Sequence, residues 1–357
     1  MAGVVFHPLL QEFLGIAITQ NASDLHFISG TPPVIRRDGR LFTVRNDVLP
    51  AETVGQIIKA ILPESRYAKY IEERELDFSL NFQSARLRVN AYFEKGNPAL
   101  SLRVIPSEIP DIETLGLPEV VKNFVNVSQG FLLITGPTGH GKSTTLAALV
   151  DHINATRSEH IITLEDPIEY VFTQKKSIIS QREVGGDTLS FSAGLRSALR
   201  EDPNVILVGE MRDLETIETA LTLAETGHLV LTTLHTNSAS QTADRIIDVF
   251  PSSKQSQIRV QFANVLLGIV SQRLLPKIHG GRALATEVLV ANSAVRTLIR
   301  EEKIHQIPNV IQTSAAEGMI SLDKQLAQLV QQGVITIDEA MAWSLDPKGL
   351  KIQMYQA

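Results

Sequence analysis

The first hundred residues combine helical and strand-like spacing of hydrophobic positions. Apolar residues in 8–18 and 51–74 recur at helical intervals, with a break near Pro63 in the second segment. Further along, every second residue is apolar and the residues between them are polar, which predicts half-buried strands at 76–82, 86–93 and 99–105. This mixture predicts an α+β module.

Two shorter elements are expected near the start of the same module. A strand begins at Ser23 and continues to about residue 28. Residues 34–42 have the pattern of a β-hairpin, with Asp38 and Gly39 as its two-residue turn. We therefore expect an N-terminal α+β domain over residues 1–107.

Prolines mark the end of this domain and a second pattern begins beyond them. Pro106, Pro110 and Pro118 lie close together, which disfavours helices and strands and predicts a linker over 108–118. In the remaining 119–357, helical patterns alternate with short apolar runs, which are 131–135, 160–164, 205–208 and 229–234. This alternation predicts a parallel sheet covered by helices. From about residue 252 the pattern is mostly helical.

Composition limits the classes of protein that fit this organisation. The 357 residues carry a net charge of -6, which argues against a general nucleic-acid binder. The absence of cysteine excludes disulfides and thiolate zinc sites. No apolar stretch approaches the ~18 residues of a membrane span, and no signal peptide is evident. We expect a cytoplasmic protein that reaches a membrane only through a partner.

A glycine-rich segment follows the first apolar run of the second domain and precedes a helical pattern. It fits the phosphate-loop motif at every fixed position, and its residues are Gly136, Pro137, Thr138, Gly139, His140, Gly141, Lys142, Ser143 and Thr144. Glycines allow backbone N–H groups to surround phosphate oxygens, and the helix N-terminus adds partial positive charge. Lys142 is expected at the β- and γ-phosphates of ATP, and Ser143 at Mg²⁺.

Two acidic residues follow apolar strands and are candidates for the chemistry of hydrolysis. Glu210 closes the run 205–208 after Gly209, which stands where an aspartate is common in Walker B strands. Glu165 closes the run 160–164. Carboxyl ends of parallel strands form the ligand crevice of such sheets. We expect Glu210 to hold Mg²⁺ directly or through water and Glu165 to activate water, with Asp166 as a turn cap; the opposite division between the two glutamates stays open.

Histidines flank the run 229–234. His235 lies at its carboxyl end, where a hydrogen bond to the γ-phosphate is one role and a structural contact is the alternative. His228, at the other end, is the weaker candidate.

These motifs together resemble the secretion ATPases of type II and type IV systems, and most closely the pilus retraction members. The resemblance covers nearly the whole chain. It is carried by the phosphate loop 136–144, an acidic box 162–170, a Walker B segment 208–213, a histidine box 232–237, and the shorter stretches 23–26 and 198–203.

The resemblance implies a RecA-like P-loop ATPase core in an α/β fold, a PAS-like N-terminal domain and a helical C-terminal part. It also implies a ring of six identical chains that uses ATP and Mg²⁺ to depolymerise a pilus through an inner-membrane platform protein. Arginines of the N-terminal domain contact phosphates in this family. Arg88 and Arg103 match best, with Arg86 less certain; solvated strand faces are the alternative.

Two features favour retraction over related activities. Secretion and extension relatives carry a four-cysteine zinc site after a Gln-Arg-Leu stretch, whereas 272–276 continues without cysteine. Residues 294–301 resemble a retraction motif, with an apolar helix face that includes Ala294 and with Arg296, Arg300 and Glu301 expected to be exposed. The alternatives are an accessory retraction paralogue, a type II secretion ATPase, and a nucleotide-gated scaffold with negligible turnover.

Overall fold

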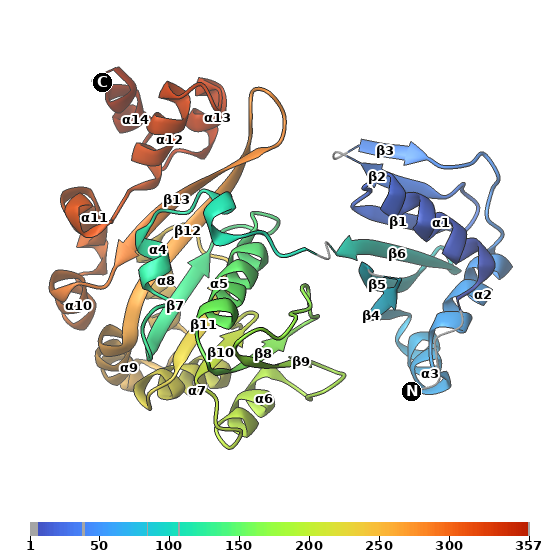
Figure 1. Ribbon diagram of the computed structural model, residues 1–357, viewed down its shortest axis with the longest axis horizontal. Helices are drawn as coiled ribbons and strands as arrows, with labels where there is room; N and C mark the ends of the chain where they lie inside the picture. The colour runs from blue at the N-terminus through green and yellow to red at the C-terminus, as the bar shows by residue number, and fades with distance from the viewer. Residues whose placement is uncertain (1–5, 38–39, 84, 106–107, 356–357) are drawn as a thin grey trace. The chain divides into compact units, whose positions relative to one another are not determined.

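The computed structural model describes residues 6–37, 40–83, 85–105 and 108–355. The chain divides into two compact units (Figure 1). Unit 1 comprises Met1–Glu108 together with Pro167–Val171, and unit 2 comprises Ile109–Asp166 and Phe172–Ala357. From Ile109 on, the segment expected to be a linker belongs to unit 2, where Ile112 is buried.

Unit 1 is an antiparallel six-stranded sheet in the order β3-β2-β1-β6-β5-β4. Its strands are β1 Asp24–Ile28, β2 Val34–Arg37, β3 Arg40–Thr43, β4 Glu75–Phe82, β5 Ala85–Glu94 and β6 Asn97–Ile105. Its helices are α1 Pro8–Thr19, α2 Ala51–Ile61 and α3 Glu64–Glu73.

One face of this sheet is apolar and the other is polar, because side chains alternate along each strand. Leu87 and Val89 of β5 pack in a buried cluster with Phe13 of α1 and Ile57 of α2. The residues between them on β5 are only half-buried. Alternation in the sequence therefore predicted β4, β5 and β6 correctly.

Two details of unit 1 refine the predicted elements. The helical segment 51–74 is two helices, and Pro63 is the N-cap residue directly before α3. Strands β2 and β3 pair as the expected hairpin. The turn assigned to Asp38 and Gly39 lies outside the described residues.

Unit 2 is a seven-stranded sheet in the order β13-β12-β7-β11-β10-β8-β9, parallel except for β13. Its strands are β7 Gly130–Thr135, β8 His160–Glu165, β9 Ile178–Glu183, β10 Val205–Val208, β11 Leu229–Leu234, β12 Leu266–Pro276 and β13 Arg282–Val290. The longer helices are α5 Lys142–Thr156, α6 Phe191–Ala198, α7 Leu214–Glu225, α8 Ala239–Asp248, α9 Ser252–Val265, α10 Ser293–Arg300, α12 Leu322–Gln331 and α14 Pro347–Tyr355. Shorter helical segments are η1 Ile112–Leu115, α4 Val120–Asn123, η2 Ile304–Gln306, α11 Ile307–Thr313, η3 Ala315–Glu317 and α13 Ile337–Trp343.

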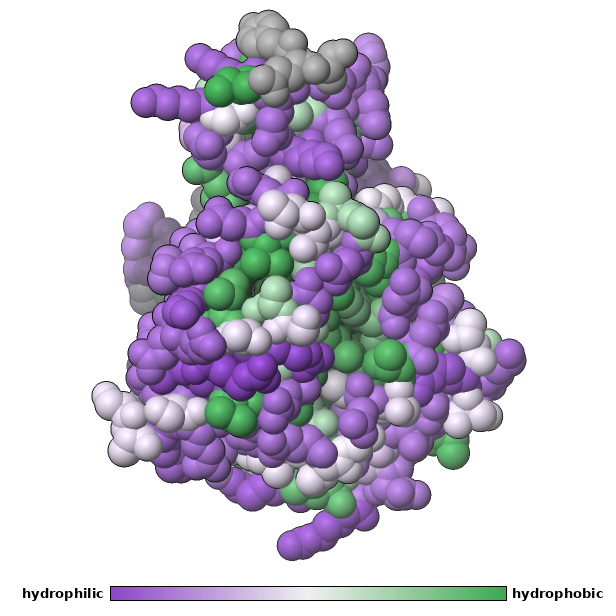
Figure 2. All heavy atoms as spheres, turned by 90° about the vertical axis from the view of Figure 1, so that its left-hand side faces the viewer, coloured by the Kyte–Doolittle hydropathy of each residue, from purple (hydrophilic) through white to green (hydrophobic). Residues whose placement is uncertain are grey.

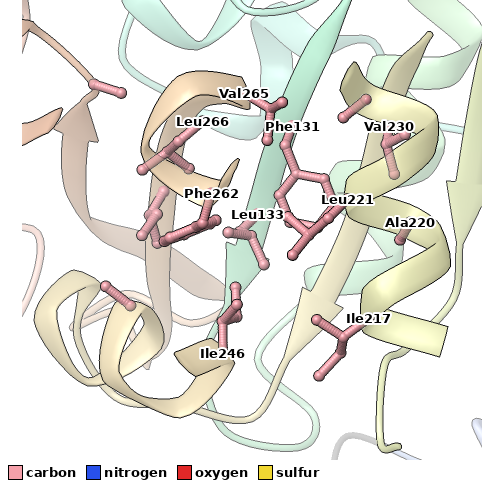
Figure 3. Close-up of a cluster of buried hydrophobic side chains, with 14 of the residues drawn as sticks. Phe131, Leu133, Ile217, Ala220, Leu221, Val230, Ile246, Phe262, Val265 and Leu266 are labelled. Atoms are coloured by element: carbon pink, nitrogen blue, oxygen red, sulfur yellow. The ribbon is translucent and has the colours of Figure 1, made fainter. Parts of the chain in front are cut away.

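Helices cover both faces of this sheet, as expected for parallel strands. Phe131 and Leu133 of β7 point to one face, where Leu221 of α7 and Phe262 of α9 pack against them (Figure 3). The alternate residues of β7 join a second cluster with α5 on the other face. All residues of β7 are buried, so the strand that leads into the phosphate loop lies in the middle of the core.

The prediction of a mostly helical region from about residue 252 is wrong for residues 266–290. There β12 pairs with β7 in parallel and with β13 in antiparallel orientation. Strand β9 was also not predicted; it is half-buried and mostly polar at the edge of the sheet.

The last helices pack on the β12–β13 pair. Leu275 of β12 and Ala283 of β13 form a buried cluster with Leu326 of α12, Ala340 of α13 and Leu350 of α14. Within the described ranges, no helix combines the length and apolar character needed to cross a bilayer. Figure 2 shows a mainly hydrophilic face on which hydrophobic side chains gather near the middle.

Candidate nucleotide site

The predicted nucleotide residues of unit 2 follow four strands that are neighbours in the sheet. The phosphate loop follows β7, His235 follows β11, Glu210 follows β10 and Glu165 ends β8. These strands are parallel, so their carboxyl ends lie along one edge of the sheet. The sequence therefore folds so that four distant motifs meet where α/β sheets bind ligands.

The glycines of the phosphate loop are required by its backbone. Gly136 has φ of 142°, and a Cβ atom there would overlap the carbonyl oxygen of Gln272. Gly139 and Gly141 have φ of 82° and 81°, in the left-handed region that favours glycine. Gly141 is also the residue before α5 and has no side chain to accept from the N–H groups of the first turn. Those groups face the loop, as in anion-binding helix termini.

Lys142 is held against the same loop. Its side chain is buried at the start of α5, and its Nζ donates to the carbonyl oxygens of Gly136 and Pro137 at 2.9 and 3.0 Å. Ser143 and Thr144 follow in the first turn and are half-buried. The ammonium group therefore lies inside the curve of the loop, where a phosphate-binding lysine is expected.

His235 lies between the basic and acidic parts of the site. Its Nδ1 is 3.4 Å from Nζ of Lys142 and 3.4 Å from Oγ1 of Thr138. Its Nε2 is 3.4 Å from Oε2 of Glu210. A single imidazole thus contacts both the phosphate-loop lysine and the Walker B acid. The other candidate, His228, contacts the carbonyl oxygen of Leu223 at 2.9 Å near the end of α7, which is a structural contact.

Glu210 forms an ion pair with an arginine that the sequence did not mark as a site residue. A guanidinium nitrogen of Arg212 lies 2.6 Å from Oε1 of Glu210, and this carboxylate raises the pKa of Arg212. The side chain of Glu210 is 16% exposed. The carboxylate is therefore held by Arg212 on one oxygen and contacted by His235 on the other.

Close packing of two strand ends explains the glycine at position 209. The N–H of Gly209 donates to the carbonyl oxygen of Leu164 at 2.8 Å. A Cβ atom on Gly209 would lie 3.3 Å from that oxygen and 3.5 Å from Cα of Glu165. An aspartate would crowd the end of β8 here.

Glu165 is oriented by polar side chains of its own and the neighbouring strand. Its Oε1 accepts from Oγ1 of Thr163 at 2.7 Å and from Nε2 of Gln181 on β9 at 3.2 Å. Asp166, which follows it, is exposed. Sequence reasoning missed Gln181 because β9 itself was not predicted.

Arg88 and Arg103 belong to unit 1, whereas the phosphate loop belongs to unit 2. They are cross-strand neighbours on the polar face of the unit 1 sheet. Nε of Arg103 is 2.9 Å from Oδ1 of Asp24, and Arg86 donates to the carbonyl oxygen of Ile168 at 3.1 Å. Their contact with phosphates stays a prediction.

The structure corrects the expected exposure of the helix α10. Arg296 is half-buried and donates to the carbonyl oxygens of Ala263, Asn264, Leu266 and Ala291. It therefore caps the end of α9 instead of facing solvent. Ala294, assigned to the apolar face, is exposed. Helical spacing placed Val295 and Ile299 in the core correctly but did not reveal that the guanidinium folds back over the preceding elements.

Comparison with known proteins agrees with this site and fold. The chain belongs to the type II/IV secretion system protein family, whose model matches residues 3–342, and it is an ATPase of that family. The RecA-like core predicted from the sequence is thereby confirmed.

Individual relatives distinguish between branches of the family. The type IV pilus "retractation" ATPase PilT of Pseudomonas aeruginosa is 47% identical over 93% of this chain and 96% of its own length. The type IV pilus ATPase PilU of the same organism is 36% identical over 96% of this chain and 91% of its own length. A crystal structure of the pilus retraction motor PilT with bound ADP has a TM-score of 0.90 and 48% identity, covering 96% of this chain and 99% of that one. The similarity favours the retraction ATPase over the accessory paralogue, as predicted.

Proposed function

We propose that this chain hydrolyses ATP to ADP and phosphate and that hydrolysis drives retraction of a type IV pilus. The observation that carries the chemical part is the meeting of Lys142, His235 and Glu210 at adjacent strand ends. Similarity to PilT along nearly the whole chain supports the biological part.

The residues of the site divide the work of hydrolysis as follows. The backbone N–H groups that the loop 136–144 offers, at every residue except Pro137, and the ammonium of Lys142 bind the phosphates. Glu165, oriented by Thr163 and Gln181, accepts a proton from the attacking water. His235 donates a hydrogen bond to the γ-phosphate and, through Glu210, links it to the Walker B strand.

Mg²⁺ fits the donors that this site offers. Within the described parts of the chain no group of three or more His, Asp or Glu side chains is arranged to hold a metal ion alone. Mg²⁺ in nucleotide sites is instead held by one or two protein oxygens together with phosphates and water. Ser143 and Glu210 would supply those oxygens here, and the ion would neutralise charge on the β- and γ-phosphates.

We also propose that six chains form a ring and that Arg88 and Arg103 reach the phosphates of a neighbouring chain. An arginine delivered to a transferring phosphate accelerates hydrolysis by roughly 10³–10⁵. Mixed rings of Arg88→Ala and Lys142→Ala chains should regain activity that neither variant has alone. No recovery in rings shown to be mixed would mean that each site is completed within one chain.

The pilus platform protein at the inner membrane is the proposed partner, and cytoplasmic location beside it follows from that proposal. A pull-down with the platform protein tests this directly.

A steady-state ATPase assay on the purified ring tests the function itself. Wild-type protein should turn over ATP, and Lys142→Ala should bind ATP more weakly and not hydrolyse it. Binding without turnover in the wild type would favour the nucleotide-gated scaffold. Turnover combined with normal pilus retraction in cells that lack the chain would favour the accessory role.

A further inference from the structure

Strand β12 holds the phosphate loop at His140. Nε2 of Gln272 donates to the backbone carbonyl of His140 at 2.7 Å, and the backbone N–H of Leu274 donates to its Nδ1 at 3.0 Å. The residue is thus bound through both its main chain and its ring. Because Nδ1 accepts a hydrogen bond, it carries no proton, and the neutral ring has its N–H at Nε2.

The ring of His140 also contacts the C-terminal helices. Trp343, the last residue of α13, packs edge-on against the imidazole with ring centroids 5.0 Å apart and an interplanar angle of 66°. Such T-shaped aromatic pairs are specific in geometry and favourable beyond the area they bury. Trp343 is anchored on the cluster that joins α12, α13 and α14 to β12 and β13.

Arg273 extends the same contact to the histidine box. Its side chain is 3% exposed. One guanidinium nitrogen donates to the backbone and side-chain oxygens of Asn237 at 2.8 and 3.1 Å. Its Cζ lies 5.9 Å from the centre of the Trp343 ring. Asn237 is two residues beyond His235, so Trp343 touches one residue of the phosphate loop and one residue that holds the histidine loop.

We propose that Trp343 is a positioning residue for nucleotide binding, through which the C-terminal helices hold His140 and Arg273 and so set the geometry of the phosphate and histidine loops. The inference rests on the proposed ATPase function. Two loops that must close on the same phosphates share one aromatic side chain, and that side chain belongs to the helices at the end of the chain. Movement of those helices therefore changes nucleotide affinity, and bound nucleotide in turn restrains the helices.

Kinetics of matched variants test this role. Trp343→Ala should raise KM for ATP by about two- to tenfold, the range set by loss of one aromatic pair, with a smaller change in kcat. Trp343→Phe retains an aromatic edge and should lie between wild type and alanine. Met341→Ala is the matched control, because Met341 packs on the same cluster from the same helix and has no ring contact with His140. It should leave KM unchanged.

A double-variant cycle separates positioning from general destabilisation. If Trp343 acts through the imidazole, Trp343→Ala combined with His140→Ser should raise KM less than the sum of the two single effects in free energy. Additive effects, or an equal rise in KM for Met341→Ala, would overturn the proposal. Thermal unfolding and ring size, measured on every variant, confirm that only folded assemblies are compared.

Tryptophan fluorescence supplies a readout that does not depend on turnover, since Trp343 is the only tryptophan of the chain. Mg²⁺ with ATP or ADP should shift the emission of the wild type but not of Lys142→Ala, and the shift should shrink in His140→Ser. Normal ATP turnover with no change in emission, and a Trp343→Ala variant with wild-type KM, would overturn the positioning role and leave the ATPase function intact. A wild type that hydrolyses no ATP would instead overturn the function on which the inference rests.

Discussion

His235 contacts Lys142 through Nδ1 and Glu210 through Nε2, each at 3.4 Å. One ring therefore spans the basic and acidic halves of the nucleotide site, and it does so from the strand between them in the sheet. We therefore predict that His235 responds to the γ-phosphate of bound ATP, because the phosphate would compete for the same hydrogen bonds.

Replacement of this ring should affect the chemical step more than binding. We expect His235→Gln to lower kcat by ~10², the scale of losing one donor to a developing negative charge, with KM changed little. Steady-state ATPase kinetics measure both constants. His228→Gln is the control, since His228 caps α7, and it should keep wild-type kcat. A normal kcat in His235→Gln would make the histidine structural.

The two acids should separate binding from hydrolysis. Glu165→Gln is expected to bind ATP normally and to lose hydrolysis, because it removes a proton acceptor without removing a phosphate contact. Gln181→Ala should lower kcat in part, since Gln181 orients Glu165. Glu210→Gln should lose hydrolysis and also weaken the Mg²⁺ dependence of nucleotide binding. Normal hydrolysis by Glu165→Gln together with an inactive Glu210→Gln would reverse these roles.

Packing at Gly209 leads to a prediction about stability. Gly209→Ala should lower the free energy of unfolding by about 1 kcal/mol, because its Cβ crowds the end of β8. Gly15→Ala is a suitable comparison. Gly15 lies in helix α1, and a methyl group added there would meet no atom within 4 Å, so alanine should be neutral or stabilising. Urea unfolding of both variants measures the difference. Equal stabilities would show that β8 and β10 separate easily.

Arg296 should now be tested as a structural residue. Loss of its hydrogen bonds to carbonyl groups at the end of α9 is expected to destabilise Arg296→Ala by about 1–3 kcal/mol. Arg300→Ala removes an exposed arginine of the same helix and should change stability by less than about 0.5 kcal/mol. Thermal melts of the two variants compare these effects. Retraction assays on Arg296→Ala are informative only after its stability is known.

Stability should depend on pH through His140. Burial lowers the pKa of its imidazole below the ordinary 6.5, and the positive charges of Arg273, Lys142 and Arg282 lower it further. As pH falls through 6.5, the unfolded chain takes up a proton at this residue while the folded chain does not, so the free energy of unfolding decreases until the lower folded pKa is reached. Urea midpoints at neutral and mildly acidic pH should therefore fall more in the wild type than in His140→Ser. Parallel changes in the two proteins would contradict the shift.

Sequence patterns predicted the parts of this molecule that have a distinct local signature. The phosphate loop has fixed glycines, and β5 of unit 1 alternates between buried and half-buried residues along most of its length. Strand β12 has no such signature at its start. Helix α9 ends at Val265 and β12 begins at the next residue, Leu266, so no turn with a glycine or proline separates the two elements. Strand β9 is polar at the sheet edge, so its spacing does not distinguish it from a loop.

Prediction of the candidate nucleotide site from sequence has the same limit as prediction of the strands. Motifs placed Lys142, Glu165, Glu210 and His235 in one ligand crevice, and the fold brings them to neighbouring strand ends. The residues that orient them, such as Gln181 and Arg273, lie on strands that were not predicted, and their roles depend on pairing across the sheet. No short window of sequence contains that information.

The hydrogen bond from Gly209 to Leu164 also fixes the positions of Glu210 and Glu165 relative to each other. Each of the two acids is the next residue after one of these partners, so the spacing between the carboxylates is set by main-chain atoms and by the length of two identical side chains. Shortening either glutamate to aspartate withdraws its carboxylate by one methylene, and the bonded backbone cannot advance to restore it. The distance between the two carboxylates is therefore fixed by the pairing of β8 with β10.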